Sequence, residues 1–157
     1  MPNNDIFIRC LLIPIGEEQL LLPSAIIAEI TSYSEPTPIT KQQPDWLLGN
    51  IDWRNKNVPL LAVENILSLP TVSSDVKYHT VILYGLENLQ RLPFYGFRIT
   101  EMPRSFMVTA DSLLNNQDAK IGPGLAYQVN IHNTEKTAWL PDLDYLENLL
   151  SQFSSPS

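Results

Sequence analysis

Prolines interrupt this chain at short intervals, and their spacing limits what it can fold into. The 157 residues include 13 prolines and only 6 glycines. Proline lacks a backbone N–H and disrupts the interior of a helix, so frequent prolines favour short strands joined by turns. The length is sufficient for one domain with its own hydrophobic core. The sequence therefore predicts a mostly β fold.

Short alternating segments supply the predicted strands. Residues 126–132 alternate cleanly, with Tyr127, Val129 and Ile131 on one face. Nine or ten such strands are expected along the chain, and residues 111–114 are predicted to form one helical turn. Strong alternation on both sides of the polar residues 71–78 predicts two lobes. Short, closely spaced strands are typical of small barrels or of a sandwich.

One long segment, residues 142–153, has the apolar spacing of a helix. Its apolar face comprises Leu143, Leu146, Leu149, Leu150 and Phe153. Asp142 and Asp144 fall in its first turn, where carboxylates complement the positive end of the helix dipole. These two acids are therefore interpreted as capping residues rather than as a catalytic pair. The chain is expected to close with this helix.

Residues 44–61 combine two tryptophans, a glycine and an arginine with the signals of a β-hairpin. The predicted parts are a strand over residues 50–54, a turn at Asn55-Lys56-Asn57 and a return strand over residues 58–63. On the first strand Ile51 and Trp53 would face one side, and Asp52 and Arg54 the other. Arg54 is therefore expected to be accessible or paired with an acid.

Glu29 is the candidate partner for Arg54. It is the only charged residue between Glu18 and Glu35, within an otherwise apolar stretch. A Glu29–Arg54 pair would fix two strands relative to each other and would orient the planar guanidinium. The alternative is that the two charges are solvated independently. The residues themselves leave both possibilities open.

The charge of the chain argues against nucleic acid and anionic membrane surfaces as partners. The formal net charge is -7, and the 10 basic residues are scattered singly. Nucleic-acid binders need clustered lysine and arginine to displace counterions from phosphates. The N-terminal residues lack a basic signal region, and the apolar runs fall short of the ~20 residues that span a membrane. We expect a cytoplasmic protein without direct membrane insertion.

No motif for catalysis, a metal or a cofactor is present in the sequence. The two histidines, His79 and His132, lie near neither a cysteine nor a carboxylate cluster. There is no glycine-rich phosphate loop and no nucleophile elbow. A non-catalytic protein is therefore expected. The alternative is a small β-barrel ligand-binding module or hydrolase whose carboxylates, such as Glu29, Asp52 and Glu64, converge from distant segments.

The three tryptophans, Trp46, Trp53 and Trp139, have two possible roles. Tryptophan and arginine are the side chains most enriched at the energetic centres of protein interfaces. Tryptophan also fills hydrophobic cores, and that is the simpler explanation for each of the three. The sequence does not separate these roles.

The run from Trp46 to Leu61 resembles the central motif of CheW-like domains. That motif is an apolar pair, a glycine, a strand ending in arginine, a turn, and then apolar-Pro-apolar-apolar, matched here by Leu47-Leu48-Gly49 through Arg54 to Val58-Pro59-Leu60-Leu61. Two further segments are similar to the family, Leu22-Pro23 with the following Glu29 and Ala138-Trp139-Leu140-Pro141-Asp142-Leu143. The likeness covers nearly the whole chain in order.

This resemblance implies a fold and a function. The fold would be a single domain over residues 1–157, built as two small intertwined five-stranded β-barrels of the SH3-like kind with a C-terminal helix at about 142–153. The function would be that of a scaffold without catalysis or cofactors, coupling a chemoreceptor (a methyl-accepting chemotaxis protein) to a CheA-type histidine kinase. A second CheW-like adaptor is a further candidate partner. In the family, the Glu and Arg matched by Glu29 and Arg54 pair at a functional surface.

Within the family the chain looks most like the ChpC-type adaptors of chemosensory systems that control type IV pili and twitching motility. Trp46, Trp53-Arg54, Leu92-Pro93-Phe94-Tyr95 and Pro103-Arg104 carry this closer likeness. The chain departs from the family pattern at Asn55, where a glycine is usual, and over residues 98–103. The predicted interaction residues are Glu29, Trp46, Gly49, Trp53, Arg54, Asn55 and Arg104.

Overall fold

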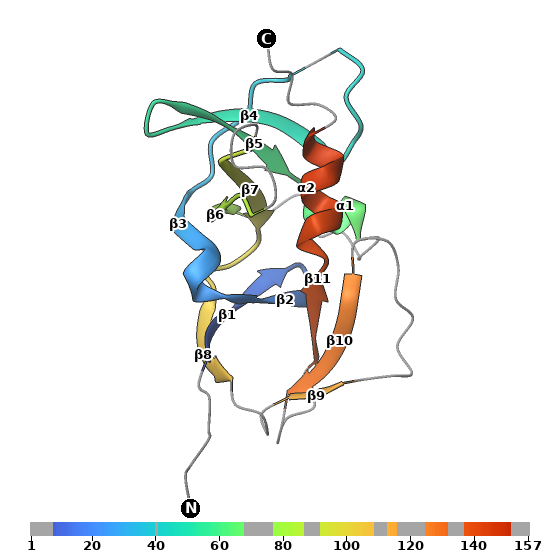
Figure 1. Cartoon of the computed structure of the whole chain (residues 1–157). Helices are drawn as coiled ribbons and strands as arrows, with labels where there is room; N and C mark the ends of the chain where they lie inside the picture. Colours follow the sequence, from blue (N-terminus) through green and yellow to red (C-terminus); the bar gives the residue numbers. More distant parts are fainter. Residues whose placement is uncertain are drawn as a thin grey trace, which may run out of the picture.

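The computed structural model describes residues 8–39, 41–67, 77–86, 92–108, 113–115, 125–131 and 137–151. Within them, the chain forms two sheets, two α-helices and one 3₁₀ helix (Figure 1). The helices are η1 (Ser24–Ile26), α1 (Val63–Ile66) and α2 (Leu143–Ser151). None of these helices is long and apolar enough to cross a membrane.

The first sheet has six strands in the order β8-β1-β2-β11-β10-β9. Their bounds are β1 (Ile8–Ile15), β2 (Glu18–Pro23), β8 (Arg104–Val108), β9 (Leu113–Asn115), β10 (Leu125–Ile131) and β11 (Thr137–Pro141). The prediction of a helical turn at residues 111–114 is wrong for Leu113 and Leu114, because both belong to β9 and pair with β10. The first two residues of that range lie outside the described part.

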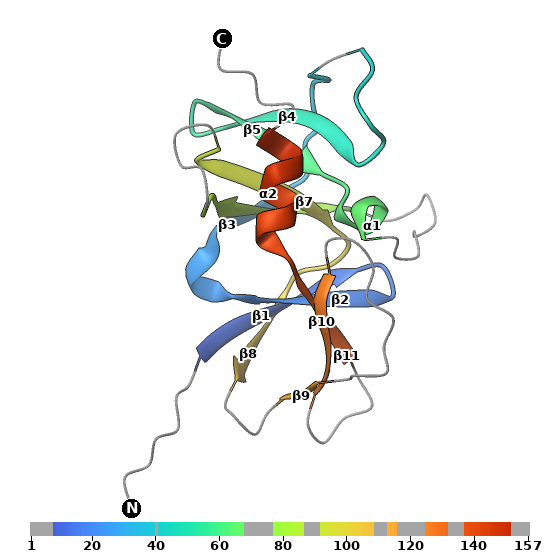
Figure 2. The ribbon, with the colours of Figure 1, turned by 45° about the vertical axis from the view of Figure 1, so that its right-hand side comes forward.

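The second sheet has five strands in the order β3-β6-β7-β5-β4. Their bounds are β3 (Ile27–Ser32), β4 (Leu47–Trp53), β5 (Lys56–Leu61), β6 (His79–Tyr84) and β7 (Phe94–Ile99). In Figures 1 and 2 this sheet lies above the six-stranded sheet, and α2 rises from β11 alongside it.

The predicted mostly β fold with a C-terminal helix is confirmed. The prediction of five strands in each barrel is correct for one sheet, whereas the other sheet has six strands. In the described residues, neither sheet closes into a barrel, because the first and last strands of each sheet do not pair with each other. The two sheets are intertwined along the chain. One sheet contains β1 and β2 together with the strands from β8 to β11, and the other contains the strands from β3 to β7. Residues 71–78 therefore do not divide the chain into two lobes, since β6 pairs with β3.

Alternation along the strands places apolar side chains in separate core clusters. On β7, Tyr95, Phe97 and Ile99 point into the main cluster, and Phe94 packs against a smaller one. The main cluster joins both sheets to the apolar face of α2 through residues such as Ile13, Leu20, Val81, Leu146 and Leu150. Two smaller clusters lie one against each sheet, and the free cysteine Cys10 is buried in the cluster of the six-stranded sheet.

The carboxylate of Glu147 fixes α2 to the end of the five-stranded sheet. Its side chain is on the helix face that packs inward, and the residue is only 2% exposed. Its two oxygens accept the backbone N–H of Leu86 at 2.9 and 3.1 Å, and one also accepts the hydroxyl of Tyr95 at 3.1 Å. At the start of the helix, the Asp142 side chain accepts the Tyr145 N–H at 3.2 Å, which confirms its predicted capping role.

Tyr95 is expected to make the stability of the fold depend on alkaline pH. Burial first, and then the charge and hydrogen bond of Glu147, raise the pKa of Tyr95 above its ordinary value of 10.0. Below that value both folded and unfolded states keep the phenol proton, so Tyr95 causes no change with pH. Above it only the unfolded chain loses the proton, so the free energy of unfolding should fall by about 1.4 kcal/mol per pH unit.

The check is urea denaturation of the wild type and of Tyr95→Phe between about pH 8 and pH 11. Above pH 10, the free energy of unfolding of Tyr95→Phe should fall less steeply with pH than that of the wild type, by up to about 1.4 kcal/mol per pH unit. Some slope should remain, because burial also raises the pKa of Tyr33. Equal slopes in the two proteins would contradict the prediction.

Candidate functional site

The β4–β5 hairpin turns at Arg54 and Asn55, one residue earlier than predicted. Their φ angles are 50° and 63°. A two-residue loop with positive φ at both positions is the turn that matches the right-handed twist of the flanking strands. Asparagine tolerates this left-handed region, whereas arginine rarely adopts it. The prediction that Arg54 ends a strand is therefore wrong, because the residue lies at the tip of the hairpin.

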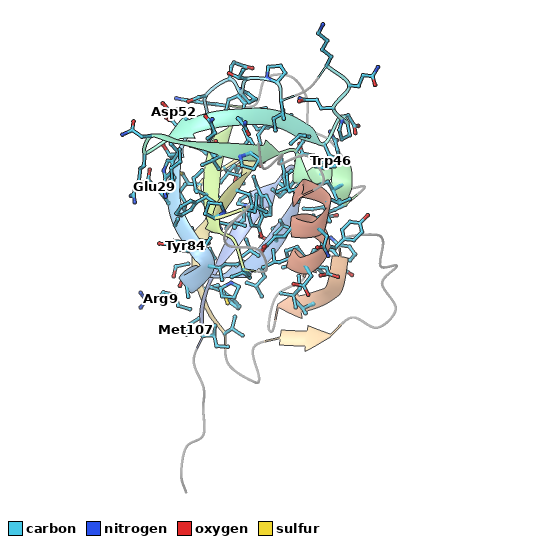
Figure 3. All side chains as sticks on the ribbon, turned by 45° about the horizontal axis from the view of Figure 1, so that its top comes forward. Arg9, Glu29, Trp46, Asp52, Tyr84 and Met107 are labelled. Carbon is cyan, nitrogen blue, oxygen red and sulfur yellow. The ribbon has the colours of Figure 1, made fainter. Side chains whose placement is uncertain are left out.

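Of the two alternatives for Glu29 and Arg54, the structure shows the ion pair, which links this tip to β3. Nη2 of Arg54 donates to Oε1 of Glu29 at 2.8 Å. Strands β3 and β4 are the two ends of the five-stranded sheet, so the pair joins ends that no strand pairing connects in the described ranges. Figure 3 shows Glu29 on the same side of the molecule as Asp52 of β4. The side chains are 65% and 36% exposed, and pairs this exposed contribute only about 0 to 1 kcal/mol to stability.

The guanidinium of Arg54 packs on the first of three aromatic rings that contact one another. The guanidinium carbon of Arg54 is 4.6 Å from the ring centre of Trp53, which is 7% exposed. The Trp53 ring meets Phe94 edge-on at 4.8 Å, and Tyr84 continues the row at 5.6 Å from Phe94. Lys56 places its ammonium 5.0 Å from the Phe94 ring centre. We call Trp53, Phe94 and Tyr84 the aromatic row. It holds two cations at a surface where Tyr84 is 45% exposed.

Gly49 shapes the strand that carries this site. Its φ is 136°, and a Cβ at this position would lie 2.3 Å from the carbonyl oxygen of Thr37. Thr37 and Asn50 exchange backbone hydrogen bonds of 2.8 Å in both directions, so the segment after β3 covers the outer edge of β4. Gly49 is thus required for this close approach, and it makes no part of the exposed tip.

Trp46 and Arg104 lie away from the hairpin tip. Trp46 precedes β4 and packs, half-buried, against the main core cluster, and Figure 3 shows it at the opposite end of β4 from Asp52. Arg104 begins β8 in the other sheet. It lines a cavity of about 440 Å³ with Glu17, Glu18 and Glu101. The structure therefore brings together four of the predicted residues, namely Glu29, Trp53, Arg54 and Asn55.

The alternative of converging carboxylates has no support in the described residues. Glu64 is buried and accepts a 2.8 Å hydrogen bond from Arg98, whereas Asp52 is exposed and Glu29 is paired with Arg54. Burial lowers the pKa of Arg98, but the hydrogen bond and charge of Glu64 outweigh it and leave the pKa above its ordinary value. Across the described ranges, no group of three or more His, Cys, Asp or Glu side chains could hold a metal ion.

Sequence reasoning missed the residues that complete the site and anchor the helix. The predicted turn includes Lys56, the ChpC-like likeness includes Phe94 without a role at the hairpin, and no site role is predicted for Tyr84. Strand alternation gives no signal that these three meet, because they come from β5, β6 and β7. Glu147 did carry a signal: it is four residues after Leu143 and three before Leu150, on the apolar stripe of the helix.

The fold and the site define a class of two-sheet β domain that presents a charged hairpin tip, braced by aromatic rings, to solvent. The chain belongs to the CheW-like domain family, whose model matches residues 9–149. The resemblance to this family is thereby confirmed, while the closer likeness to ChpC-type adaptors stays a prediction.

A solved structure supports the same fold. It is the scaffolding protein TtCheW from Thermoanaerobacter tengcongensis, with a TM-score of 0.72, 12% sequence identity, and coverage of 91% of this chain and 89% of that one. At this identity the likeness bears on the fold alone. A search of curated protein sequences gave no match.

Proposed function

We propose that this chain is a non-catalytic scaffold of chemosensory signalling that couples a chemoreceptor to a CheA-type histidine kinase. Membership of the CheW-like family supports this function, and the similar solved structure is itself described as a scaffolding protein. The narrower assignment, a system that controls type IV pili and twitching motility, is supported by the ChpC-like segments around Trp53-Arg54 and Leu92-Pro93-Phe94-Tyr95. A second CheW-like adaptor is a further candidate partner.

The observation that carries the proposal is the Arg54–Glu29 pair at the hairpin tip. An exposed ion pair adds little stability, so its 2.8 Å geometry and its support by Trp53 have more value for recognition. The pair and the ring beneath it restrict the arginine before a partner arrives, which reduces the entropy lost on binding. Arginine next to aromatic side chains is also the composition typical of interface hot spots.

Arg54→Glu should weaken binding to the receptor or kinase about tenfold or more, because it places like charges against each other at the tip. The free energy of unfolding should change by no more than about 1 kcal/mol, since the lost pair is exposed. Titration of labelled protein with the kinase's regulatory domain and with a receptor tip measures binding, and urea denaturation measures stability.

Two matched variants sharpen this test. The exchange Glu29→Arg with Arg54→Glu restores an ion pair and should recover part of the affinity if the pair acts by positioning. Lys41→Glu changes the net charge equally at an exposed residue of the loop before β4 and should bind normally. Unchanged affinity in Arg54→Glu would show that the arginine is merely solvated. Capture of neither partner by the folded wild type would refute the scaffold itself.

The link to pili can be tested separately through gene neighbourhood. Adjacent genes for a kinase, a receptor and a pilus motor would support the assignment. A neighbourhood of flagellar genes would contradict it and would leave the scaffold function intact.

A further inference from the structure

Within the part of the chain that the structure describes, β8 leaves one edge of the six-stranded sheet open. It stands at the end of the strand order, and its other side pairs with β1 from Ile8↔Val108 to Leu12↔Arg104. In the described residues no strand or bridge pairs with its outer side. Figures 1 and 2 show β8 in the lower left part of the molecule, below β1. Backbone N–H and C=O groups on such an edge are free to pair with another extended chain.

The two sheets differ in how their edges are protected. On the five-stranded sheet, Thr37 covers part of the β4 edge with two backbone hydrogen bonds, and Glu29–Arg54 joins β3 to the hairpin. The β8 strand itself, Arg104–Val108, contains no proline and no lysine, and its single charge is at its first residue. The features that usually block pairing at a free edge are therefore scarce on β8.

Exposed apolar side chains gather at this same edge. Six large hydrophobic residues are well exposed in the described ranges, and Ile8, Met102 and Met107 are 47%, 55% and 44% exposed. Ile8 and Met107 lie on the β1–β8 pair and point to opposite faces of the sheet, and Met102 just precedes β8. An apolar margin along a free backbone edge is suited to an added strand, which would cover both.

The charges at this edge select the kind of strand that fits. β1 and β8 carry two arginines and no carboxylate, in a chain whose net charge is -7. Neither Arg9 nor Arg104 forms an ion pair among the described residues, although three glutamates line the cavity beside Arg104. The register places Arg9 opposite Met107, and Figure 3 shows their side chains close together at one margin.

The strand register also fixes where an acidic partner must carry its carboxylates. Arg9 points to the face of Met107, whereas Arg104 is three residues earlier on β8 and therefore points to the opposite face. A strand added beside β8 lies next to Arg104 and, with β8 in between, about 10 Å from the backbone of Arg9 on β1. Two of its carboxylates can reach toward both arginines only if they are separated by an odd number of positions. A spacing of three matches the separation of Met107 and Arg104.

We propose that β8 is a docking edge for an extended segment of a partner protein, which pairs with it as an additional strand and carries two carboxylates three residues apart. This inference does not depend on the scaffold function. It also does not involve the hairpin tip, which lies on the other sheet.

The proposal can be tested with synthetic peptides added to the isotopically labelled full chain. The probe is acetyl-Thr-Val-Glu-Val-Val-Glu-Val-Thr-amide. The first control has the same composition with its glutamates two residues apart, Thr-Val-Glu-Val-Glu-Val-Val-Thr, so both acids share one face. The second control is the probe with alternate amides N-methylated, which removes the donors for main-chain pairing. Amide chemical shifts report both affinity and location.

The probe should perturb the amides of β8 and of the neighbouring β1 residues, at low salt. It should bind about three- to fivefold more tightly than the respaced peptide, the effect of one additional exposed ion pair. Arg104→Gln and Arg9→Gln should each reduce the affinity for the probe by a similar factor. The N-methylated peptide should not bind.

Three results would overturn the proposal. Equal binding of the N-methylated peptide would show that strand pairing is not involved, and equal binding of the two spacings would remove the role of the arginines. Concentration-dependent shifts of the β8 amides in the free protein would show that a second copy of the chain occupies this edge instead.

Discussion

Replacing Gly49 with alanine is expected to destabilise the protein by about 3 kcal/mol, since strained backbone angles and buried clashes each cost of order 1–3 kcal/mol. The φ of 136° lies outside the range that side chains accept, and the new methyl carbon would lie 2.3 Å from the Thr37 carbonyl oxygen. The segment at Thr37 must then move away from β4, and the two hydrogen bonds with Asn50 are lost. Urea denaturation measures the change.

Asp52→Ala is the matched control for this variant. Asp52 lies on the same strand, three residues further on, and is exposed. Its replacement should leave the free energy of unfolding nearly unchanged. If Gly49→Ala were as stable as Asp52→Ala, Thr37 would not approach β4 closely in solution. The conclusion that the segment at Thr37 covers the β4 edge would then be wrong.

Replacing Glu147 with alanine is expected to cost a similar amount, about 3 kcal/mol. A buried donor left without an acceptor costs about 1–3 kcal/mol, which applies to the Tyr95 hydroxyl, and the part-buried Leu86 N–H adds a smaller amount. The Leu86 N–H and the Tyr95 hydroxyl would lose the carboxylate that now accepts both. A void would also open between α2 and the five-stranded sheet. Glu147→Gln keeps one acceptor oxygen in the same volume and should lose roughly half as much.

The location of this effect can be measured together with its size. Limited proteolysis should cut α2 earlier in Glu147→Ala than in the wild type, because the helix loses its polar attachment to the sheet. Tyr145→Phe removes a hydroxyl from the exposed side of the same helix and should change neither stability nor cleavage. Wild-type stability in Glu147→Ala would show that the apolar face of α2 suffices to dock it.

The hairpin shows how far local sequence can be taken. Alternation correctly placed Ile51 and Trp53 on the buried side of β4, and Asp52 on the exposed side. The turn was placed one residue too late, because three consecutive polar residues, Asn55-Lys56-Asn57, look like a loop. Strand twist instead favours two positive-φ residues, and Arg54 accepts one of these positions with its side chain supported by Trp53 and Glu29.

The C-terminal helix contains a buried polar residue that its periodicity did not predict. Its apolar periodicity predicted the helix and its buried face correctly, since that face is determined by the spacing of leucines. A glutamate within that face was passed over, because carboxylates are rarely buried without a partner. The partners are Leu86, two residues after β6, and Tyr95 of β7, both more than 50 residues earlier in the chain.

The fold class, the closing helix and the CheW-like resemblance could be predicted from the sequence, which left the Glu29–Arg54 pairing as one of two alternatives. These follow from proline spacing, side-chain periodicity and local motifs, all of which are properties of short segments. The division of the strands between the sheets, the predicted residues that meet and the edge left unpaired among the described residues follow from the three-dimensional structure. Those outcomes depend on pairing between strands far apart in the chain, where many registers satisfy the same apolar pattern and packing selects one.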